Sequence, residues 1–160
     1  MTLALKRMIH AELLSIIAGD LAVIERAHRE AREAATHDEA KPENDKDTRA
    51  LELSYLARGQ AKRIEELRAG VADLTAMALR LFSEGDPVTL GAIVDVADDS
   101  AESSVFIAPY GGGSKVGGGR IQVVTPQSPL GRALLGRHSG EECDVTMGGK
   151  TRQLTIVRLT

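Results

Sequence analysis

The residues of this 160-residue chain best suited to chemistry lie in an acidic run at positions 36–48, THDEAKPENDKDT. Five carboxylates surround a single proline in this run: Asp38, Glu39, Glu43, Asp45 and Asp47. Mg²⁺ prefers oxygen ligands and is commonly held by one or two carboxylates together with waters and substrate phosphates. An exposed pair of carboxylates would bind the ion too weakly alone, but it could complete a site in a partner. A solvated acidic turn is the alternative interpretation.

Heptad patterns on both sides of the acidic run predict the elements that position it. Before the run, apolar or small residues recur at intervals of three and four: Leu14, Ile17, Leu21, Ile24, His28, Ala31 and Ala35. The pattern returns after it at Ala50, Leu53, Ala57, Gln60, Ile64, Leu67, Val71, Leu74, Ala78 and Leu81. Each seam alone would leave an apolar stripe in water, so we expect an antiparallel coiled-coil hairpin.

The acidic run then forms the turn of that hairpin. Pro42 blocks helix continuation and biases Lys41 away from the helical region, which places the turn at residues 38–45. Arms of about 30 residues would be about 45 Å long. His28 falls on the seam, where we expect a histidine bonded to a neighbour. The Arg, Lys and Glu residues between seam positions predict a solvated surface with ion pairs, or alternatively contacts to a nucleic-acid backbone.

The second half of the chain has the signals of a small sheet. Gly85 and Pro87 end the helical pattern, and five β-branched segments follow: 88–98, 103–109, 120–126, 141–147 and 152–159. Between the third and fourth, Ser128 is a good N-cap, Pro129 a good first residue and Gly136 a good stop for one short helix. We therefore predict an α+β protein with a hairpin at 1–82, a linker at 83–87 and a mostly antiparallel sheet domain at 88–160.

Composition restricts the function. The net charge of -3 and an aromatic content of 2% argue against a protein that coats nucleic acid through phosphate neutralisation or base stacking. The single Cys143 excludes an internal disulfide and fits a reducing compartment. The N-terminal residues contain no apolar stretch of membrane-spanning length, so we expect a soluble, cytoplasmic protein without a membrane partner.

Other motifs carry little chemistry. The glycine-rich stretch YGGGSKVGGGR at 110–120 has Ser before Lys and precedes a strand, so it fails the phosphate-loop pattern. It predicts a flexible loop between strands, with a contact surface for a partner as the alternative. The four histidines lack metal-site spacing, and no Ser-His-Asp or Cys-His set can be assembled.

Taken together, these features resemble the GreA/GreB family of bacterial transcript cleavage factors over nearly the whole chain. The most specific match is the Ser-Pro-aliphatic-x-Arg-x-Leu-aliphatic-Gly segment, formed by Ser128, Pro129, Leu130, Arg132, Leu134, Leu135 and Gly136. The hairpin turn, Glu39-Ala40-Lys41-Pro42-Glu43-Asn44, keeps the family's order of acid, Lys, Glu and Asn with one extra residue. The resemblance implies an FKBP-like C-terminal domain that docks on RNA polymerase and is not an isomerase.

The resemblance also implies a function. The hairpin would enter the secondary channel of bacterial RNA polymerase, where tip carboxylates help that enzyme hold a second Mg²⁺ and hydrolyse backtracked RNA near its 3′ end. Glu43 would act with Glu39 or Asp38, with Asp45 as an auxiliary. Ser128, Pro129, Leu130 and Arg132 would dock on the polymerase. A non-catalytic channel regulator and a coiled-coil adaptor unrelated to polymerase are the alternatives.

Overall fold

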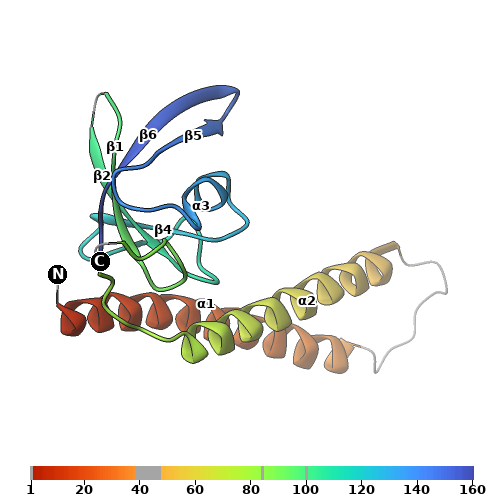
Figure 1. Cartoon of the computed structure of the whole chain (residues 1–160). Helices are drawn as coiled ribbons and strands as arrows, with labels where there is room; N and C mark the ends of the chain where they lie inside the picture. The colour runs from red at the N-terminus through yellow and green to blue at the C-terminus, as the bar shows by residue number, and fades with distance from the viewer. Residues whose placement is uncertain (1, 39–47, 84, 100) are drawn as a thin grey trace.

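The computed structural model describes residues 2–38, 48–83, 85–99 and 101–160. Two long helices come first, α1 at Leu3–Asp38 and α2 at Thr48–Ala76. Figure 1 shows them side by side, extending together beyond the sheet. A six-stranded sheet with one short helix follows, which confirms the predicted α+β class.

The two helices are antiparallel, as predicted. Near the start of α1, His10 Nε2 lies 2.8 Å from the carbonyl oxygen of Leu74. Farther along α1, His28 Nδ1 lies 3.4 Å from Gln60 Oε1 on an earlier turn of α2. Because His28 and Gln60 are both predicted seam positions, this contact confirms that the seams face each other there and that His28 bonds a neighbour.

The predicted seams are wrong near their ends. Ala31 is exposed, and α2 ends at Ala76, so Ala78 and Leu81 lie beyond the helix and are exposed. After Ala76 it is Met77 and Leu79 that turn toward the apolar cluster beneath the helices. The spacing of three and four residues continues to Leu81, but the helix ends at Ala76. Periodicity locates the end of a helix only approximately.

The sheet has the strand order β3-β4-β2-β1-β6-β5. The strands are β1 Ile93–Ala97, β2 Glu102–Ile107, β3 Lys115–Val116, β4 Ile121–Val124, β5 Glu142–Met147 and β6 Lys150–Leu159. Strands β2 and β4 are parallel, whereas the other neighbouring pairs are antiparallel. Each of the five predicted segments overlaps one strand, although β2 and β6 begin one and two residues before their segments, and the mostly antiparallel sheet is confirmed.

Both faces of the sheet are covered because its central strands are apolar on both sides. On one face, Ile93 and Phe106 join the buried residues of the hairpin, including Leu13 and Leu74, in a single cluster. On the other face, Val94, Val96, Val105, Ile107 and Ile156 pack with the short helix. Alternation along each strand sends successive side chains to opposite faces, which produces these two cores.

The glycine-rich stretch is not the flexible loop that its composition predicts. Its middle forms β3, which pairs with β4, and Val116 is fully buried. The N–H of Gly117 donates to Glu12 Oε2 of α1 at 2.9 Å. A side chain at Gly111 would lie 2.8 Å from Leu13 Cδ1. The glycines therefore let the backbone approach α1 closely, which is a packing role that local composition does not reveal.

In the described part of the chain, neither long helix nor the short one has an apolar stretch sufficient to cross a membrane.

Candidate functional site

The segment predicted to dock a partner forms a capped turn of helix, α3 at Pro129–Leu134. Ser128 Oγ accepts the N–H of Gly131 at 3.0 Å and donates to the carbonyl oxygen of Thr125 at 2.8 Å. Pro129 begins the helix, where its missing N–H costs nothing. Gly136 follows the helix with a φ of 78°, a conformation that favours glycine. The predicted cap and stop are therefore confirmed.

Close packing against the preceding loop fixes the position of α3. A Cβ atom at Gly131 would lie 2.0 Å from the carbonyl oxygen of Thr125, so no larger residue fits there without moving the backbone. One turn later, Leu134 is fully buried in the core on this face of the sheet. The short helix is held by a tight turn at one end and an apolar anchor at the other.

The four predicted docking residues divide into two groups. The hydroxyl of Ser128 is used within the cap, and half-buried Leu130 packs against the core. Pro129 and Arg132 are exposed. This arrangement lets Ser128 position the helix while Pro129 and Arg132 face outward.

The predicted metal-orienting acids belong to the connection between the far ends of the hairpin. Asp38 is the last residue of α1, and α2 begins at Thr48. The structure describes only the backbone of Asp38, while Glu39, Glu43 and Asp45 lie outside the described residues. The 36 residues of α1 extend about 54 Å at 1.5 Å per residue, so the acidic connection follows a long arm.

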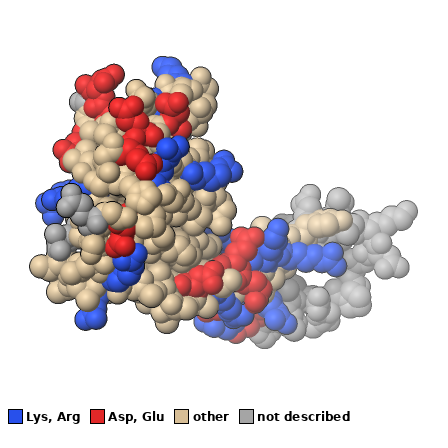
Figure 2. Space-filling model, in the orientation of Figure 1, with Lys and Arg blue, Asp and Glu red and all other residues tan. Residues whose placement is uncertain are grey.

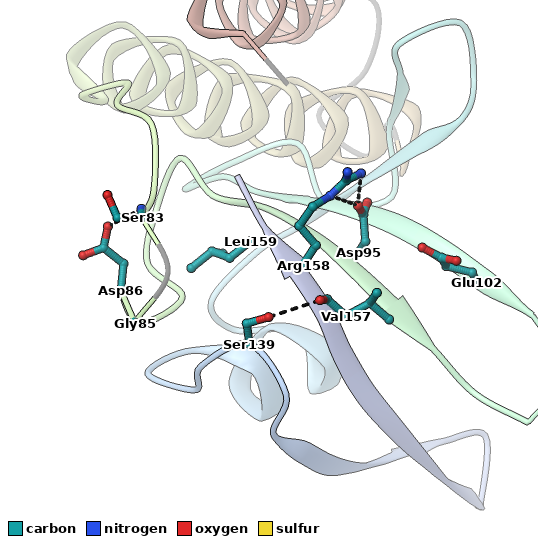
Figure 3. A pocket seen from close by; sticks show the side chains of 9 residues that line it. All are labelled: Ser83, Gly85, Asp86, Asp95, Glu102, Ser139, Val157, Arg158 and Leu159. Atoms are coloured by element: carbon teal, nitrogen blue, oxygen red, sulfur yellow. Dashed lines mark hydrogen bonds and ion pairs between the residues drawn. The ribbon is translucent and has the colours of Figure 1, made fainter.

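A separate group of carboxylates lines a cavity of about 450 Å³ beside the linker (Figure 3). Asp95 Oδ2 accepts from Arg158 Nε and Nη2 at 2.9 and 2.6 Å, and Asp95 Oδ1 accepts from Ser104 Oγ at 2.6 Å. Asp86 accepts the N–H of Ser83, and this hydrogen bond, reinforced by Arg80, lowers the pKa of Asp86. Asp95 and Asp86 thus have protein partners. No cluster of three potential metal ligands occurs among the described residues.

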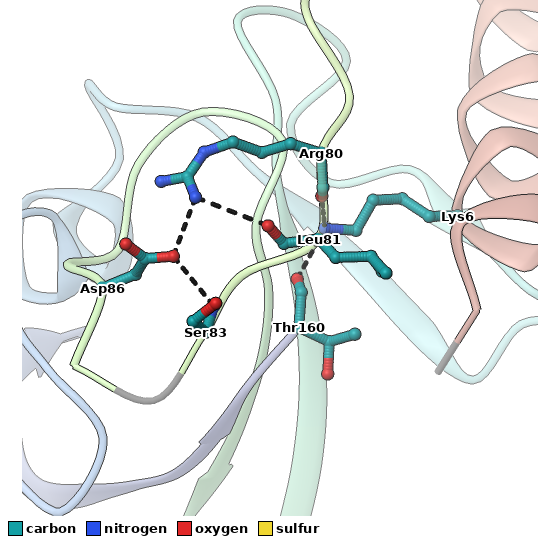
Figure 4. A network of polar contacts seen from close by, with 6 residues as sticks. All are labelled: Lys6, Arg80, Leu81, Ser83, Asp86 and Thr160. Atoms are coloured by element: carbon teal, nitrogen blue, oxygen red, sulfur yellow. Dashed lines mark hydrogen bonds and ion pairs between the residues drawn. The ribbon is translucent and has the colours of Figure 1, made fainter.

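A buried lysine joins the hairpin to the end of the sheet, as Figure 4 shows. Lys6 of α1 is fully buried, and its Nζ donates to the carbonyl oxygens of Arg80 and Thr160 at 2.7 and 2.6 Å. Burial, with a smaller effect from the charge of Arg80, lowers the pKa of the Lys6 amine to about 8. Lys6 therefore connects three segments: the first helix, the chain after the second helix, and the end of β6.

The ring of Phe82 contacts two cations at this joint, the place where Lys6 connects the hairpin to the sheet. Lys6 Nζ is 4.5 Å and the Arg80 guanidinium carbon 4.0 Å from the centre of the Phe82 ring. Arg80 also pairs with Asp86 at 2.8 Å. Cation–π contacts and the ion pair together hold the chain between hairpin and sheet.

Sequence reasoning missed this joint. The one available signal was that Lys6 precedes Ile9, Leu13 and Ile17 at intervals of three and four, on the buried side of α1.

The outer surface of the hairpin carries mixed charge (Figure 2). Arg68 pairs with Glu25 of the other helix at 2.7 Å and with Glu65 of its own helix at 2.9 Å. Lys62 and Arg63 lie 3.9 and 3.5 Å from Glu66. These three- and four-residue spacings are those predicted for a solvated, ion-paired helix surface. Such exposed pairs contribute little individually to stability.

Comparison with known proteins places this α+β hairpin protein in a family. A family model described as "Transcription elongation factor, GreA/GreB, C-term" matches residues 83–160. Transcription elongation factor GreA of Rhodospirillum rubrum is 32% identical over 155 residues, covering 94% of this chain and 90% of that protein. Transcription elongation factor GreA of Brucella anthropi is 31% identical over 137 residues, covering 84% and 75% respectively.

Among solved structures, GreA factor homolog 1 of Thermus thermophilus aligns over 92% of this chain and 94% of its own, with a TM-score of 0.41 and 17% identity. The relationship rests on the sequence matches, which extend through both the hairpin and the sheet. The chain belongs to the GreA/GreB family of transcription elongation factors.

Proposed function

We propose that this chain binds bacterial RNA polymerase and stimulates cleavage of backtracked RNA by inserting its hairpin into the secondary channel. It would act as an accessory factor in the cytoplasm, where transcription occurs, and the polymerase would remain the nuclease. The nascent RNA 3′ end would be reached through the polymerase site.

One structural observation carries this proposal: the acidic connection follows the far ends of two helices whose other ends are packed against the sheet. Among residues 2–33 and 55–76, whose burial the structure describes, the buried residues of α1 lie between Lys6 and Ile17, and those of α2 between Ile64 and Leu74. Beyond them, the two helices continue as a narrow pair. An arm of this kind supports delivery of carboxylates into a site too narrow for the sheet.

The donor set of the acidic connection fits Mg²⁺. Carboxylate oxygens are the ligands this ion prefers, and one or two from a protein suffice when waters and phosphates supply the others. When bound at a phosphodiester, Mg²⁺ stabilises developing charge and makes water a better nucleophile. Because an exposed pair of carboxylates would bind the ion too weakly alone, we assign the ion to a site shared with the polymerase.

The roles of the chain's own residues follow from this assignment. Glu43, paired with Glu39 or Asp38, would supply the carboxylates that orient the ion and its water. Asp45 would be an auxiliary carboxylate. Through the sheet region, α3 would dock on the polymerase surface. The contacts of Lys6 with Arg80 and Thr160 would set the direction in which the hairpin leaves that surface.

Release of short 3′ RNA fragments from stalled, backtracked elongation complexes tests this function. We expect the wild-type chain to accelerate release and Glu43→Gln to lower the rate by about 100-fold, a typical effect of removing a positioned catalytic group. Glu30→Gln is the matched control because Glu30 is exposed on the same arm. Its release rate should equal that of the wild-type chain.

The same assay separates the alternatives. Polymerase binding with slower elongation and no fragment release would indicate a non-catalytic channel regulator. If the chain did not bind the polymerase, the remaining hypothesis would be a coiled-coil adaptor unrelated to polymerase. Equal rates for wild-type and Glu43→Gln proteins would remove the proposed role of Glu43.

A further inference from the structure

One loop of the sheet domain contacts both helices of the hairpin through consecutive residues. Gly111, which has a φ of 87°, approaches α1 so closely that a Cβ atom there would lie 2.8 Å from Leu13 Cδ1. The preceding residue, Tyr110, lies against α2, where a Cβ atom at Gly70 would be 2.5 Å from the Cγ atom of the Tyr110 ring. This loop therefore touches the base of both helices.

The Tyr110 side chain follows α2 toward the outer part of the hairpin. Its ring packs over buried Gly70, and its hydroxyl accepts a hydrogen bond from Arg63 Nη1 at 3.1 Å. Gly70 and Arg63 are seven residues apart, so they lie on the same side of the helix and about 10 Å apart along its axis. Because the ring is half-buried against the helix, it is not available as a platform for a nucleic-acid base.

The backbone on either side of Tyr110 is bonded to the sheet. The N–H of Ala108 donates to the carbonyl oxygen of Val124 at 3.0 Å, and the N–H of Gly113 donates to that of Val123 at 2.9 Å. Both acceptors belong to β4. The position of Tyr110 is therefore tied to the sheet from both sides of the loop.

These contacts form a second attachment between hairpin and sheet, separate from that of Lys6. Leu13 follows Lys6 by seven residues, which is about 10 Å along α1. Two separate points of attachment fix the direction of a rod, whereas a single point leaves the rod free to tilt. Beyond the second attachment, both helices continue past the sheet (Figure 1).

The length of the hairpin amplifies any change in its direction. From Gly70 to Thr48, the first residue of α2, the helix measures about 33 Å at 1.5 Å per residue. A rotation of about 2° at Gly70 would therefore move Thr48 by about 1 Å. Displacing a catalytic group by about 1 Å can lower a rate about 100-fold.

We propose that Tyr110 is a positioning residue: through its contacts with Gly70 and Arg63 it sets the angle between hairpin and sheet, and this angle governs the rate of RNA cleavage. The inference rests on the proposed function and adds a residue that acts through the whole outer part of the hairpin. Affinity for the polymerase should not depend on Tyr110, because α3 packs on the opposite face of the sheet.

Fragment release from backtracked complexes, measured over a range of protein concentrations, separates rate from affinity. Tyr110→Ala should lower the maximal rate roughly tenfold to a hundredfold and leave the half-saturating concentration unchanged. Tyr110→Phe keeps the ring over Gly70 and should retain more of the rate. The control is Tyr55→Ala, which removes an exposed tyrosine of the same helix and should match the wild-type chain in both quantities.

Arg63→Gln tests the hydrogen bond to the Tyr110 hydroxyl. The matched control is Lys62→Gln, because Lys62 and Arg63 lie 3.9 and 3.5 Å from Glu66, and Arg63 in addition contacts Tyr110. Arg63→Gln should lower the maximal rate in the wild-type background and have no effect in the Tyr110→Phe background, where the hydroxyl is absent. An equal loss in both backgrounds would overturn the role assigned to this hydrogen bond.

Distances between spin labels measure the angle of the hairpin without the polymerase. Arg29→Cys on α1 and Lys150→Cys on β6 replace exposed residues, and Cys143→Ser removes the native thiol. In this background Tyr110→Ala should shift or broaden the distance distribution. An unchanged distribution would overturn the positioning role.

Gly70→Ala provides a second variant in case Tyr110→Ala fails to fold. The new methyl group meets the Tyr110 ring, so the same label distance and the maximal cleavage rate should both change. Gly59→Ala is its control, because a Cβ atom there meets nothing within 4 Å, and it should leave both unchanged.

The outcomes distinguish this inference from the proposed function. If the wild-type chain does not accelerate fragment release, the proposed function fails, and the claim about the cleavage rate fails with it. If the wild-type chain and Tyr110→Ala accelerate release equally, the inference alone fails. A higher half-saturating concentration with an unchanged maximal rate would place Tyr110 in polymerase binding and would also overturn the inference.

Discussion

The two ends of the helical hairpin are built differently. At the base, Ile9, Leu13 and Ile17 of α1 and Leu67 and Leu74 of α2 are buried because the sheet forms a third layer beneath them. In the outer part, residues 18–33 and 55–63 include no fully buried position, and the helices have only each other. The base of the hairpin therefore packs into the core together with the sheet, whereas the outer part is held by the interface between the two helices.

This difference suits an arm that must be both directed and narrow. The base transmits the position of the sheet to the helices through apolar packing and the Lys6 contacts, while the outer part relies on its seam and on exposed ion pairs. A third layer along the outer part would thicken the arm. We therefore expect the apolar contacts at the base of the hairpin to contribute more to the free energy of unfolding than those of the narrow outer part.

Truncating one apolar side chain at each end tests this contrast most strongly. Leu13→Ala removes a fully buried side chain and should lower the free energy of unfolding by about 3 to 5 kcal/mol. Ile24→Ala, at a half-buried seam position of the same helix, should cost about 1 kcal/mol because little cavity is created. Urea unfolding of the full chain measures both values. Equal losses would show that the outer interface is as well packed as the base.

Buried Lys6 should also make the free energy of unfolding depend on pH in the alkaline range. Buried Lys6 has its pKa lowered from 10.5 to about 8, so between these values the unfolded state binds more protons than the folded state. Stability should therefore rise with pH across this window, by up to about 3 kcal/mol for a group of this kind. Below pH 8 both states are protonated and the cost of burying the charge is present in full.

Lys6→Met isolates this effect because methionine keeps an apolar stem of similar length without the amine. The difference in unfolding free energy between wild type and variant should change in favour of wild type from about pH 8 to pH 10.5. Parallel pH profiles would contradict the assignment, since all other titrating groups are shared by the two proteins.

The sequence predicted those features that depend on local signals. Heptad spacing predicts the hairpin, and the succession of Ser128, Pro129 and Gly136 predicts α3. In contrast, the Lys6 contacts join residues 74 and 154 positions apart, and the Glu12–Gly117 contact spans 105. Strand β3 is only two residues long and lies inside the glycine-rich stretch, so it is too short to show a periodic pattern in the sequence. A groove on the face of the sheet that carries α3 could not be foreseen for the same reason, since all six strands and α3 contribute residues to it.

Two glycines of α2 provide the finest test of the contrast between base and outer arm. A Cβ atom at Gly70 would lie 2.5 Å from Tyr110 Cγ, whereas one at Gly59 would meet nothing within 4 Å. Both substitutions to alanine gain helix propensity, worth about 1 kcal/mol. Gly59→Ala should therefore stabilise the protein, while Gly70→Ala should destabilise it by about 1 to 2 kcal/mol once the ring has shifted.

The Tyr110→Ala background separates the ring clash from helix propensity. There, Gly70→Ala should become stabilising, like Gly59→Ala, because the atoms that oppose the new methyl group are gone. Thermal unfolding of the four variants and wild type measures the cycle. A persistent loss in the Tyr110→Ala background would mean that the backbone of the sheet, rather than this ring, limits how closely α2 approaches.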